Sequence, residues 1–154
     1  MAPDPGGAGG PFGVLFVCTG NICRSPTAEA LARRELERYP GVPIQVSSAG
    51  SHALEGNPAA SRSMLAASTR GASLERHFAR ELTRRRVRSA GLVLCMAAEH
   101  RPFVLSYDRS AASRTFLLVA VSGFGTCMIA FALSRSFALL IAGRVAMGAS
   151  AGRL

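Results

Sequence analysis

The sequence of 154 residues predicts an α/β protein organised around a parallel sheet. Three apolar runs, at residues 14–17, 42–48 and 92–96, have the length and composition of strands. Segments with helical patterns lie between these runs. Because strands that alternate with helices are joined by crossover connections, this order favours parallel over antiparallel pairing.

The first helix is expected over residues 26–39. Ser25 suits the N-cap and Pro26 the first helical position, and Pro40-Gly41 ends the segment. Its apolar side is expected to consist of four residues: Ala28, Leu31, Ala32 and Leu36. Further helices are expected over residues 58–69 and 97–105, and the basic segment 81–88 is expected to be a solvent-exposed helix face.

The chain carries a net charge of +9, and all 18 of its basic residues are arginine. Together with abundant Ala and Gly, this is typical of GC-rich coding DNA and indicates no particular function. A basic balance still favours acidic or phosphorylated partners through long-range attraction. The arginines are scattered, and no aromatic residues interleave the run at residues 84–88, so no nucleic-acid binding is expected.

The four cysteines, Cys18, Cys23, Cys95 and Cys127, are spaced irregularly, unlike a secreted disulfide framework. Residues 1–12 are rich in Pro and Gly, lack the features of a signal peptide and are expected to form a flexible tail. No CxxC pair or His/Cys cluster indicates zinc, so neither a metal nor a cofactor is expected. The reducing cytoplasm is therefore the expected compartment.

Residues 13–30, GVLFVCTGNICRSPTAEA, combine a strand, a short loop and a helix start. Cys18 ends the strand, and Arg24 follows after five residues, directly before Ser25. A loop of this length can point successive backbone N–H groups at one centre, to which the helix adds its positive end. Arg24 can offer a planar fork to phosphate, and the converging positive charge favours the Cys18 thiolate. The spacing therefore predicts a phosphate site with a cysteine nucleophile.

The segment LFVCTGNICRSPTAEAL resembles the signature of the low-molecular-weight protein tyrosine phosphatases. The similarity continues through VSSAGSHALEGNPAAS, HFARELT and LVLCMAAEHR, and it covers residues 13–116. It implies a flavodoxin-like, three-layer fold in which helices cover both faces of a four-stranded parallel sheet. The implied activity is the hydrolysis of phosphotyrosine in protein substrates through a phosphocysteine intermediate.

The resemblance also implies a role for each residue of the loop. Cys18 is the implied nucleophile, and Arg24 is the implied residue that binds phosphate and stabilises the transition state. Asn21 would hold the loop in a strained turn with support from His77, and the Ser25 hydroxyl can donate to the sulfur as it leaves. The implied phosphate cradle consists of Thr19, Gly20, Asn21, Ile22, Cys23, Arg24 and Ser25.

Three further positions bear on redox chemistry and substrate choice. Cys23 resembles the second cysteine of the family, which can form a reversible disulfide with the nucleophile, although a small packing residue is an alternative interpretation. Ile22 resembles the tyrosine-directed members, because relatives that act on phosphoarginine tend to carry Thr there. Leu54 is the only bulky apolar residue in the loop that corresponds to the family's substrate-ring contact.

The sequence departs from the family at the general acid, an aspartate that usually belongs to an Asp-Pro motif on a late loop. The chain contains only Asp4, in the N-terminal tail, and Asp108, which lies before the position of that loop. Because general acid catalysis contributes about 10²–10⁴-fold, we expect reduced activity. The alternatives are a phosphate-binding pseudo-phosphatase or a membrane-associated fusion fragment, and, with less support, an arsenate reductase, whose redox relay Cys95 and Cys127 match poorly.

The last part of the chain differs in character. Residues 115–133 carry no charge, and residues 117–154 are similar to a pair of transmembrane helices of major facilitator superfamily transporters. Their length favours membrane contact, whereas Arg144 and the Gly and Ser residues favour packing on the sheet, with residues 116–121 as a fourth strand. We therefore divide the chain into three parts: a tail over residues 1–12, a C-terminally incomplete phosphatase domain over 13–116 and an apolar tail over 117–154.

Overall fold

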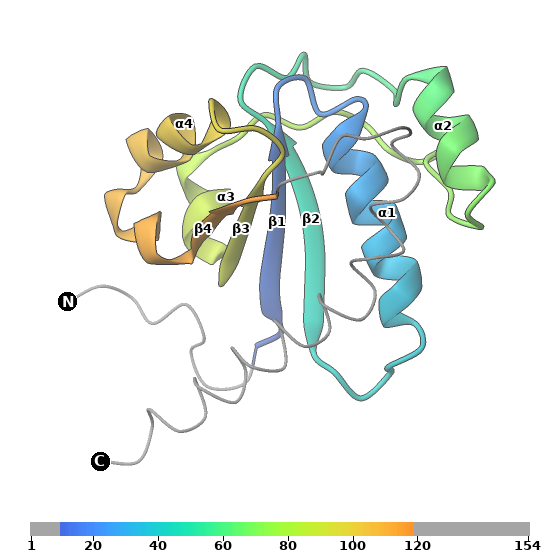
Figure 1. Cartoon of the computed structure of the whole chain (residues 1–154), viewed down its shortest axis with the longest axis horizontal. Coiled ribbons are helices and arrows are strands. Elements are labelled where there is room, and N and C mark those ends of the chain that lie inside the picture. The colour runs from blue at the N-terminus through green and yellow to red at the C-terminus, as the bar shows by residue number, and fades with distance from the viewer. Residues whose placement is uncertain (1–9, 119–154) are drawn as a thin grey trace. The chain divides into compact units, whose positions relative to one another are not determined.

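A computed structural model describes residues 10–118 of the chain, which form a four-stranded parallel sheet in the order β2-β1-β3-β4 (Figure 1). The strands are β1 (Phe12–Cys18), β2 (Ile44–Gly50), β3 (Leu92–Cys95) and β4 (Thr115–Leu117). All three pairings are parallel. The predicted α/β class and its flavodoxin-like, four-stranded architecture are therefore confirmed.

Four α-helices and one 3₁₀-helix accompany these strands: α1 (Arg24–Leu36), α2 (Ser61–Ser68), α3 (Arg84–Ser89), α4 (His100–Tyr107) and η1 (Arg109–Arg114). Each predicted helix is present, but several boundaries differ from the sequence prediction. The second helix begins at residue 61, and the fourth begins at residue 100. The residues before these starts form the loops that leave β2 and β3; the loop after β2 and the first residue of α4 contact the site described below.

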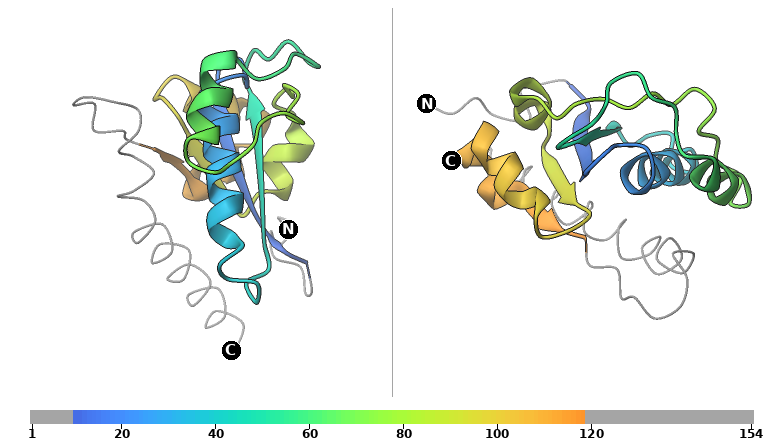
Figure 2. Two further views of the ribbon diagram at one scale, coloured as in Figure 1. Left: turned by 90° about the vertical axis from the view of Figure 1, so that its right-hand side faces the viewer. Right: turned by 90° about the horizontal axis from the view of Figure 1, so that it is seen from above.

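The sheet separates two sets of side chains, because alternate residues of a strand point to opposite faces. On one face, side chains of β1 and β3 pack with α3 and α4 in a buried cluster that includes Leu15, Val17, Val87, Val93 and Val104. On the other face, Ser48 of β2 donates a hydrogen bond to Glu29 of α1. Figure 2 shows the strands between α1 and the pair formed by α3 and α4.

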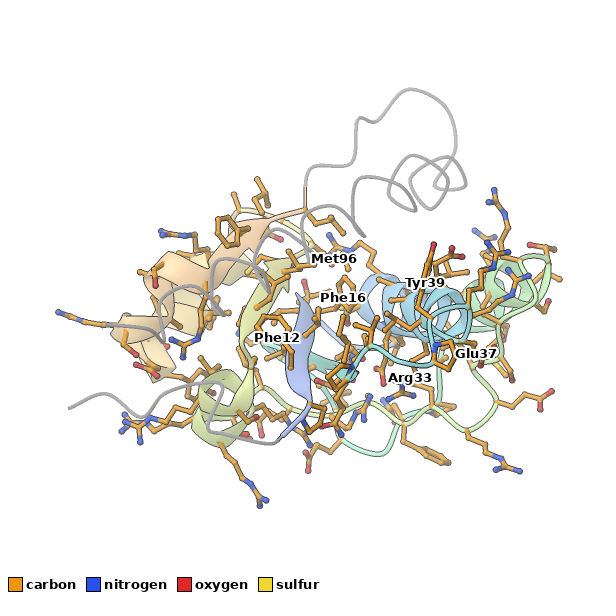
Figure 3. The ribbon with its side chains drawn as sticks, turned by 90° about the horizontal axis from the view of Figure 1, so that it is seen from below. Phe12, Phe16, Arg33, Glu37, Tyr39 and Met96 are labelled. Carbon is orange, nitrogen blue, oxygen red and sulfur yellow. The ribbon has the colours of Figure 1, made fainter. Side chains whose placement is uncertain are left out.

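The face of the sheet toward α1 also carries large apolar side chains. Figure 3 shows Phe12, Phe16 and Met96 gathered over β1 and β3, beside the helix that carries Arg33 and Glu37. The Phe12 ring lies so close to Gly91 that a Cβ added to this glycine would come within 2.4 Å of it. A residue without a side chain is therefore required at position 91 for the ring to pack there.

The start and the buried side of α1 differ from the sequence prediction. The N-cap is Cys23, without a side-chain cap, because the Ser25 hydroxyl is buried and bonds elsewhere. Leu31 and Leu36 are only partly buried, whereas Glu29 is 3% exposed. The helix therefore presents the Glu29 carboxylate to the interior, where it takes part in the hydrogen-bond network described below with the site.

Strand β4 uses the first three residues of the uncharged run 115–133. It is shorter than the predicted strand over residues 116–121 and begins one residue earlier. Among the described helices, α1 to α4, none has the length and apolar character needed to cross a membrane. The predictions about the tail beyond residue 118, including its resemblance to transporter helices, lie outside the described residues.

Candidate active site

The loop between β1 and α1 lies at the carboxyl ends of the strands, where open α/β sheets place their ligands (Figure 1). Cys18 is the last residue of β1 and is buried. Its sulfur lies 2.9 Å from the Ser25 hydroxyl and accepts the backbone N–H of Asn21 at 3.3 Å. The backbone of Asn21 and the Ser25 hydroxyl thus both contact this sulfur.

Asn21 shapes the loop through its backbone and its side chain. Among the described residues other than glycine, it alone has a positive φ, of 53°, a conformation that Asn tolerates better than most residues. Its side-chain amide donates to Ser25 at 2.9 Å and to Ser48 at 2.8 Å. Its backbone carbonyl accepts from the His77 ring at 2.7 Å. Because Ser25 accepts from Asn21, its own hydroxyl hydrogen is available for the Cys18 sulfur.

A buried ionic network lies behind Asn21, and the sequence analysis did not identify it. Ser48 accepts from Asn21 and donates to the Glu29 carboxylate. The Arg80 guanidinium donates to Glu29 at 2.7 Å, while the backbone N–H of Arg80 donates to the Asn21 side-chain oxygen at 2.8 Å. Arg33 forms a second ion pair with Glu29. The sequence contains one signal for this network: Glu29 lies one helical turn after Ser25 and therefore on the same side of α1.

The loop after β2 closes against the phosphate loop. The backbone N–H groups of Ser51 and His52 donate to the carbonyls of Cys18 and Thr19, both at 2.9 Å. At Gly50, an added Cβ would lie 2.5 Å from the Thr19 carbonyl oxygen and 2.9 Å from the Asn21 nitrogen. The two loops can approach this closely only because Gly50 has no side chain.

Comparison with known proteins agrees with this geometry. The family model for low molecular weight phosphotyrosine protein phosphatase matches residues 13–122. The chain belongs to this family. The match extends six residues beyond the range that the quoted motifs indicated.

Similar proteins include the low molecular weight protein-tyrosine-phosphatase Etp of Escherichia coli (strain K12), which is 42% identical over 104 residues that cover 68% of this chain and 67% of Etp. A protein-arginine-phosphatase of Geobacillus stearothermophilus is 36% identical over 108 residues, which cover 70% of each protein. The crystal structure of a low molecular weight protein tyrosine phosphatase from T. tengcongensis matches with a TM-score of 0.71 and 30% identity, over 86% of this chain and 99% of that chain. These relatives are all named as phosphatases, and their names record two kinds of substrate.

The family loop ends at the N-terminus of α1. Arg24 is the first residue of this helix and is exposed, as is Cys23 before it, whereas Ile22 is partly buried. The Ile22 carbonyl accepts from the Ala60 N–H at 2.8 Å, so the approach to α2 also supports the loop. The positive end of a helix, the exposed guanidinium and the backbone N–H groups are suited to bind a phosphate dianion.

A second histidine that the sequence analysis did not single out also contacts the loop. His100, the first residue of α4, is 1% exposed, and its Nε2 lies 3.0 Å from the Thr19 hydroxyl oxygen. Burial, followed by the charge of Arg24, lowers the pKa of His100, and the carboxylate of Glu99 opposes this shift. His100 is therefore within electrostatic range of the arginine that faces the phosphate site.

The remaining acid and thiol candidates lie elsewhere. Asp108 follows α4 at the end opposite His100. A hydrogen bond from the Ser110 hydroxyl, followed by the charges of Arg114 and Arg88, lowers the pKa of Asp108, and burial opposes this shift. Burial in β3 raises the pKa of Cys95 to about 11, although Arg101 opposes the shift, so this thiol is not a reactive one. Between residues 10 and 118, no group of three or more His, Cys, Asp or Glu side chains could hold a metal ion. Asp4 and Cys127 lie outside the described residues.

Proposed function

We propose that this chain hydrolyses phosphotyrosine in proteins through a phosphocysteine intermediate. The Cys18 thiolate attacks phosphorus, the tyrosine oxygen leaves, and water then hydrolyses the S–P bond. The observation that carries this proposal is the direction of the hydrogen bonds around the sulfur. Asn21 donates to Ser25, and Ser25 can therefore donate to Cys18 in both the attacking and the leaving state.

The proposed phosphate contacts come from the loop between Cys18 and α1. Its backbone N–H groups and the Arg24 guanidinium would hold the three non-bridging oxygens, and Arg24 would stabilise the charge that they carry in the transition state. His77 and Asn21 would keep the loop in this conformation before substrate arrives, since both are already hydrogen-bonded in the described structure. The binding site would then need little rearrangement.

We propose phosphotyrosine rather than phosphoarginine as the substrate because of Ile22. This side chain lies in the phosphate loop and is apolar, so it can contact an aromatic ring but cannot pair with the polar guanidino group of phosphoarginine. Phosphoarginine has to be considered as a substrate because one relative is a protein-arginine-phosphatase. Turnover of a phosphoarginine peptide faster than a matched phosphotyrosine peptide would contradict the assignment.

We further propose that turnover of phosphotyrosine is slow. Asp108, the aspartate within the described residues 10–118, is held at the far end of α4 by Arg88 and Arg114 and offers no carboxylic acid at the loop, while Asp4 lies outside the described residues. Proton donation typically contributes about 10²–10⁴-fold, and it matters most for a leaving group as basic as the tyrosine phenolate. An activated aryl phosphate should therefore be hydrolysed faster than phosphotyrosine.

The thiols also bear on where the protein works. A thiolate nucleophile requires a reducing compartment, which is consistent with the cytoplasm. Cys23 is exposed and belongs to the same loop as Cys18, and we propose that it forms a reversible disulfide with Cys18 under oxidation. Mass spectrometry after peroxide treatment would detect this bond, and irreversible oxidation of Cys18 with Cys23 still reduced would contradict it.

The decisive experiment compares the full chain with its Cys18→Ser variant. The wild type should release phosphate from p-nitrophenyl phosphate, and acid quenching should trap phosphate on Cys18. The variant should lose this turnover while it still binds inorganic phosphate, because Ser preserves the shape of the loop. A wild type that binds phosphate without turnover would be a pseudo-phosphatase, and turnover that survives Cys18→Ser would exclude Cys18 as the nucleophile.

A further inference from the structure

The contact between Thr19 and His100 joins the loop that carries the nucleophile to the helix on the opposite side of the sheet from α1. Thr19 follows Cys18 directly, and its residue is exposed, whereas His100 is buried. The hydroxyl oxygen and Nε2 are 3.0 Å apart. A buried imidazole thus has one hydrogen-bonded route to the solvent side of the site, through a hydroxyl adjacent to the reacting sulfur.

The hydrogen bond can take two directions, and the difference matters chemically. When the imidazole is neutral and Nε2 accepts, the Thr19 hydrogen points toward His100. When the imidazole is protonated, Nε2 donates to Thr19, and the hydroxyl hydrogen is free to point toward a substrate. Protonation of His100 would therefore change Thr19 from a donor to the protein into a donor to the substrate.

We propose that Thr19 and His100 form a proton relay that protonates the leaving oxygen of the substrate. The proposal rests on the phosphatase function proposed above and identifies a proton source for it. Thr19 would be the catalytic residue, since its hydroxyl would contact the ester oxygen, and His100 would be a positioning residue that acts through Thr19. The relay would replace the missing carboxylic acid only in part, so phosphotyrosine would still turn over more slowly than an activated aryl phosphate.

The first chemical step balances as follows. The Cys18 thiolate forms the S–P bond while the bond between phosphorus and the tyrosine oxygen breaks. The leaving oxygen takes the Thr19 hydrogen as Thr19 takes the Nε2 hydrogen of protonated His100, so tyrosine leaves neutral and His100 becomes neutral. In the second step water attacks phosphorus, its proton passes to Thr19 and the Thr19 proton returns to Nε2, while the S–P bond breaks and restores the thiolate.

The groups around His100 determine the pH at which its imidazole carries the proton that the relay transfers. Burial, followed by Arg24 at the start of α1 and His52 in the loop after β2, disfavours the protonated form of His100, whereas Glu99 on α4 favours it. A phosphate dianion bound by Arg24 would offset the effect of this guanidinium. Substrate binding should therefore promote protonation of His100, and the relay should act more strongly as the pH falls below neutrality.

The test uses the full chain and two aryl phosphates that differ in leaving-group basicity. Phosphotyrosine requires a proton on its leaving oxygen, whereas 2,4-dinitrophenyl phosphate does not. Thr19→Val removes the hydroxyl at nearly constant shape, and it should lower kcat/KM for phosphotyrosine at least about tenfold more than it lowers kcat/KM for dinitrophenyl phosphate. Thr19→Ser keeps a hydroxyl and should retain most of the phosphotyrosine rate.

His100→Gln supplies an independent readout through the pH profile. In the wild type, the ratio of the phosphotyrosine rate to the dinitrophenyl phosphate rate should rise as the pH falls from 7 to 5, and in the variant this rise should disappear. Equal losses on both substrates in Thr19→Val, or a wild-type pH dependence that survives in His100→Gln, would overturn the relay and leave the phosphatase function intact. A wild type inactive on both substrates would overturn the phosphatase function itself.

Discussion

Arg80 and Glu29 form an ion pair directly behind the phosphate loop, with the Arg80 Nη2 atom 2.7 Å from the Glu29 Oε2 atom. The same arginine fixes the Asn21 side-chain oxygen through its backbone N–H. Asn21, Ser48, Glu29 and Arg80 therefore form a closed ring of contacts. The ring sets the orientation of the Asn21 amide, and this orientation directs the Ser25 hydroxyl toward the Cys18 sulfur.

Glu29→Gln should destabilise the protein, because it leaves two arginines beside a neutral amide at a site that is 3% exposed. Removing one partner of a fully buried pair costs about 3–5 kcal/mol, and the partial exposure of Arg80 reduces the expected loss to about 2–3 kcal/mol. The matched control is Glu35→Gln, which breaks the exposed pair with Arg38 and should cost less than about 1 kcal/mol. Urea unfolding measures both values, and similar losses in the two variants would contradict a special role for Glu29.

Gly50→Ala should weaken phosphate binding, because the new methyl group would meet the Thr19 carbonyl oxygen and the Asn21 nitrogen and displace the loop. Overpacking of this kind costs about 1–3 kcal/mol, which corresponds to a loss of about 5- to 150-fold in affinity if the loop absorbs the shift. Gly41→Ala is the control, since no atom lies within 4 Å of its added Cβ. Calorimetric titration with inorganic phosphate should separate the two variants, and unchanged affinity in Gly50→Ala would mean that the loop tolerates the displacement.

Ser25→Ala should slow the second chemical step more than the first, since the leaving sulfur loses its hydroxyl donor. A hydrogen bond to a charged group is worth about 1.5–3 kcal/mol, so breakdown of phosphocysteine should slow about 10- to 100-fold. Rapid-quench kinetics with p-nitrophenyl phosphate should then show a burst of nitrophenolate near one equivalent. Ser68→Ala, which removes an exposed helix hydroxyl, should leave the kinetics unchanged. A Ser25→Ala variant without a burst would indicate that the hydroxyl does not assist the leaving sulfur.

Cys95 should resist alkylation in the folded protein, because burial raises its pKa to about 11. At pH 8 iodoacetamide should modify the exposed Cys23 and leave Cys95 unmodified, and in urea both should react. Since the folded-state pKa lies above the value of 9.0 for an unperturbed thiol, Cys95 favours folding below about pH 9 and loses this contribution as the pH rises toward 11. Peptide mass spectrometry gives the modification at each site, and rapid labelling of Cys95 at pH 8 would contradict its burial.

The fold and the nucleophile loop could be predicted because their signals are local. The run that ends at Cys18 has the continuous apolar character of a strand covered on both faces, and the spacing from Cys18 to Arg24 fits one loop before one helix. Helix starts were less predictable. Ser25 has the chemistry of an N-cap, but its hydroxyl bonds to Cys18 and Asn21 in the interior, and no local pattern distinguishes these two uses.

The sequence by itself determined the parallel α/β class, the cysteine at the end of β1 and the arginine at the start of α1. Only the tertiary structure decided what lies around them: Arg80 reaches Asn21 across 59 positions in the chain, and His100 reaches Thr19 across 81. These contacts depend on the strand order β2-β1-β3-β4, which brings the loops after β2 and β3 to either side of the loop after β1. Local patterns encode hydrogen bonds within one turn of chain, whereas pairings between distant segments arise only once the sheet sets which strand ends are neighbours.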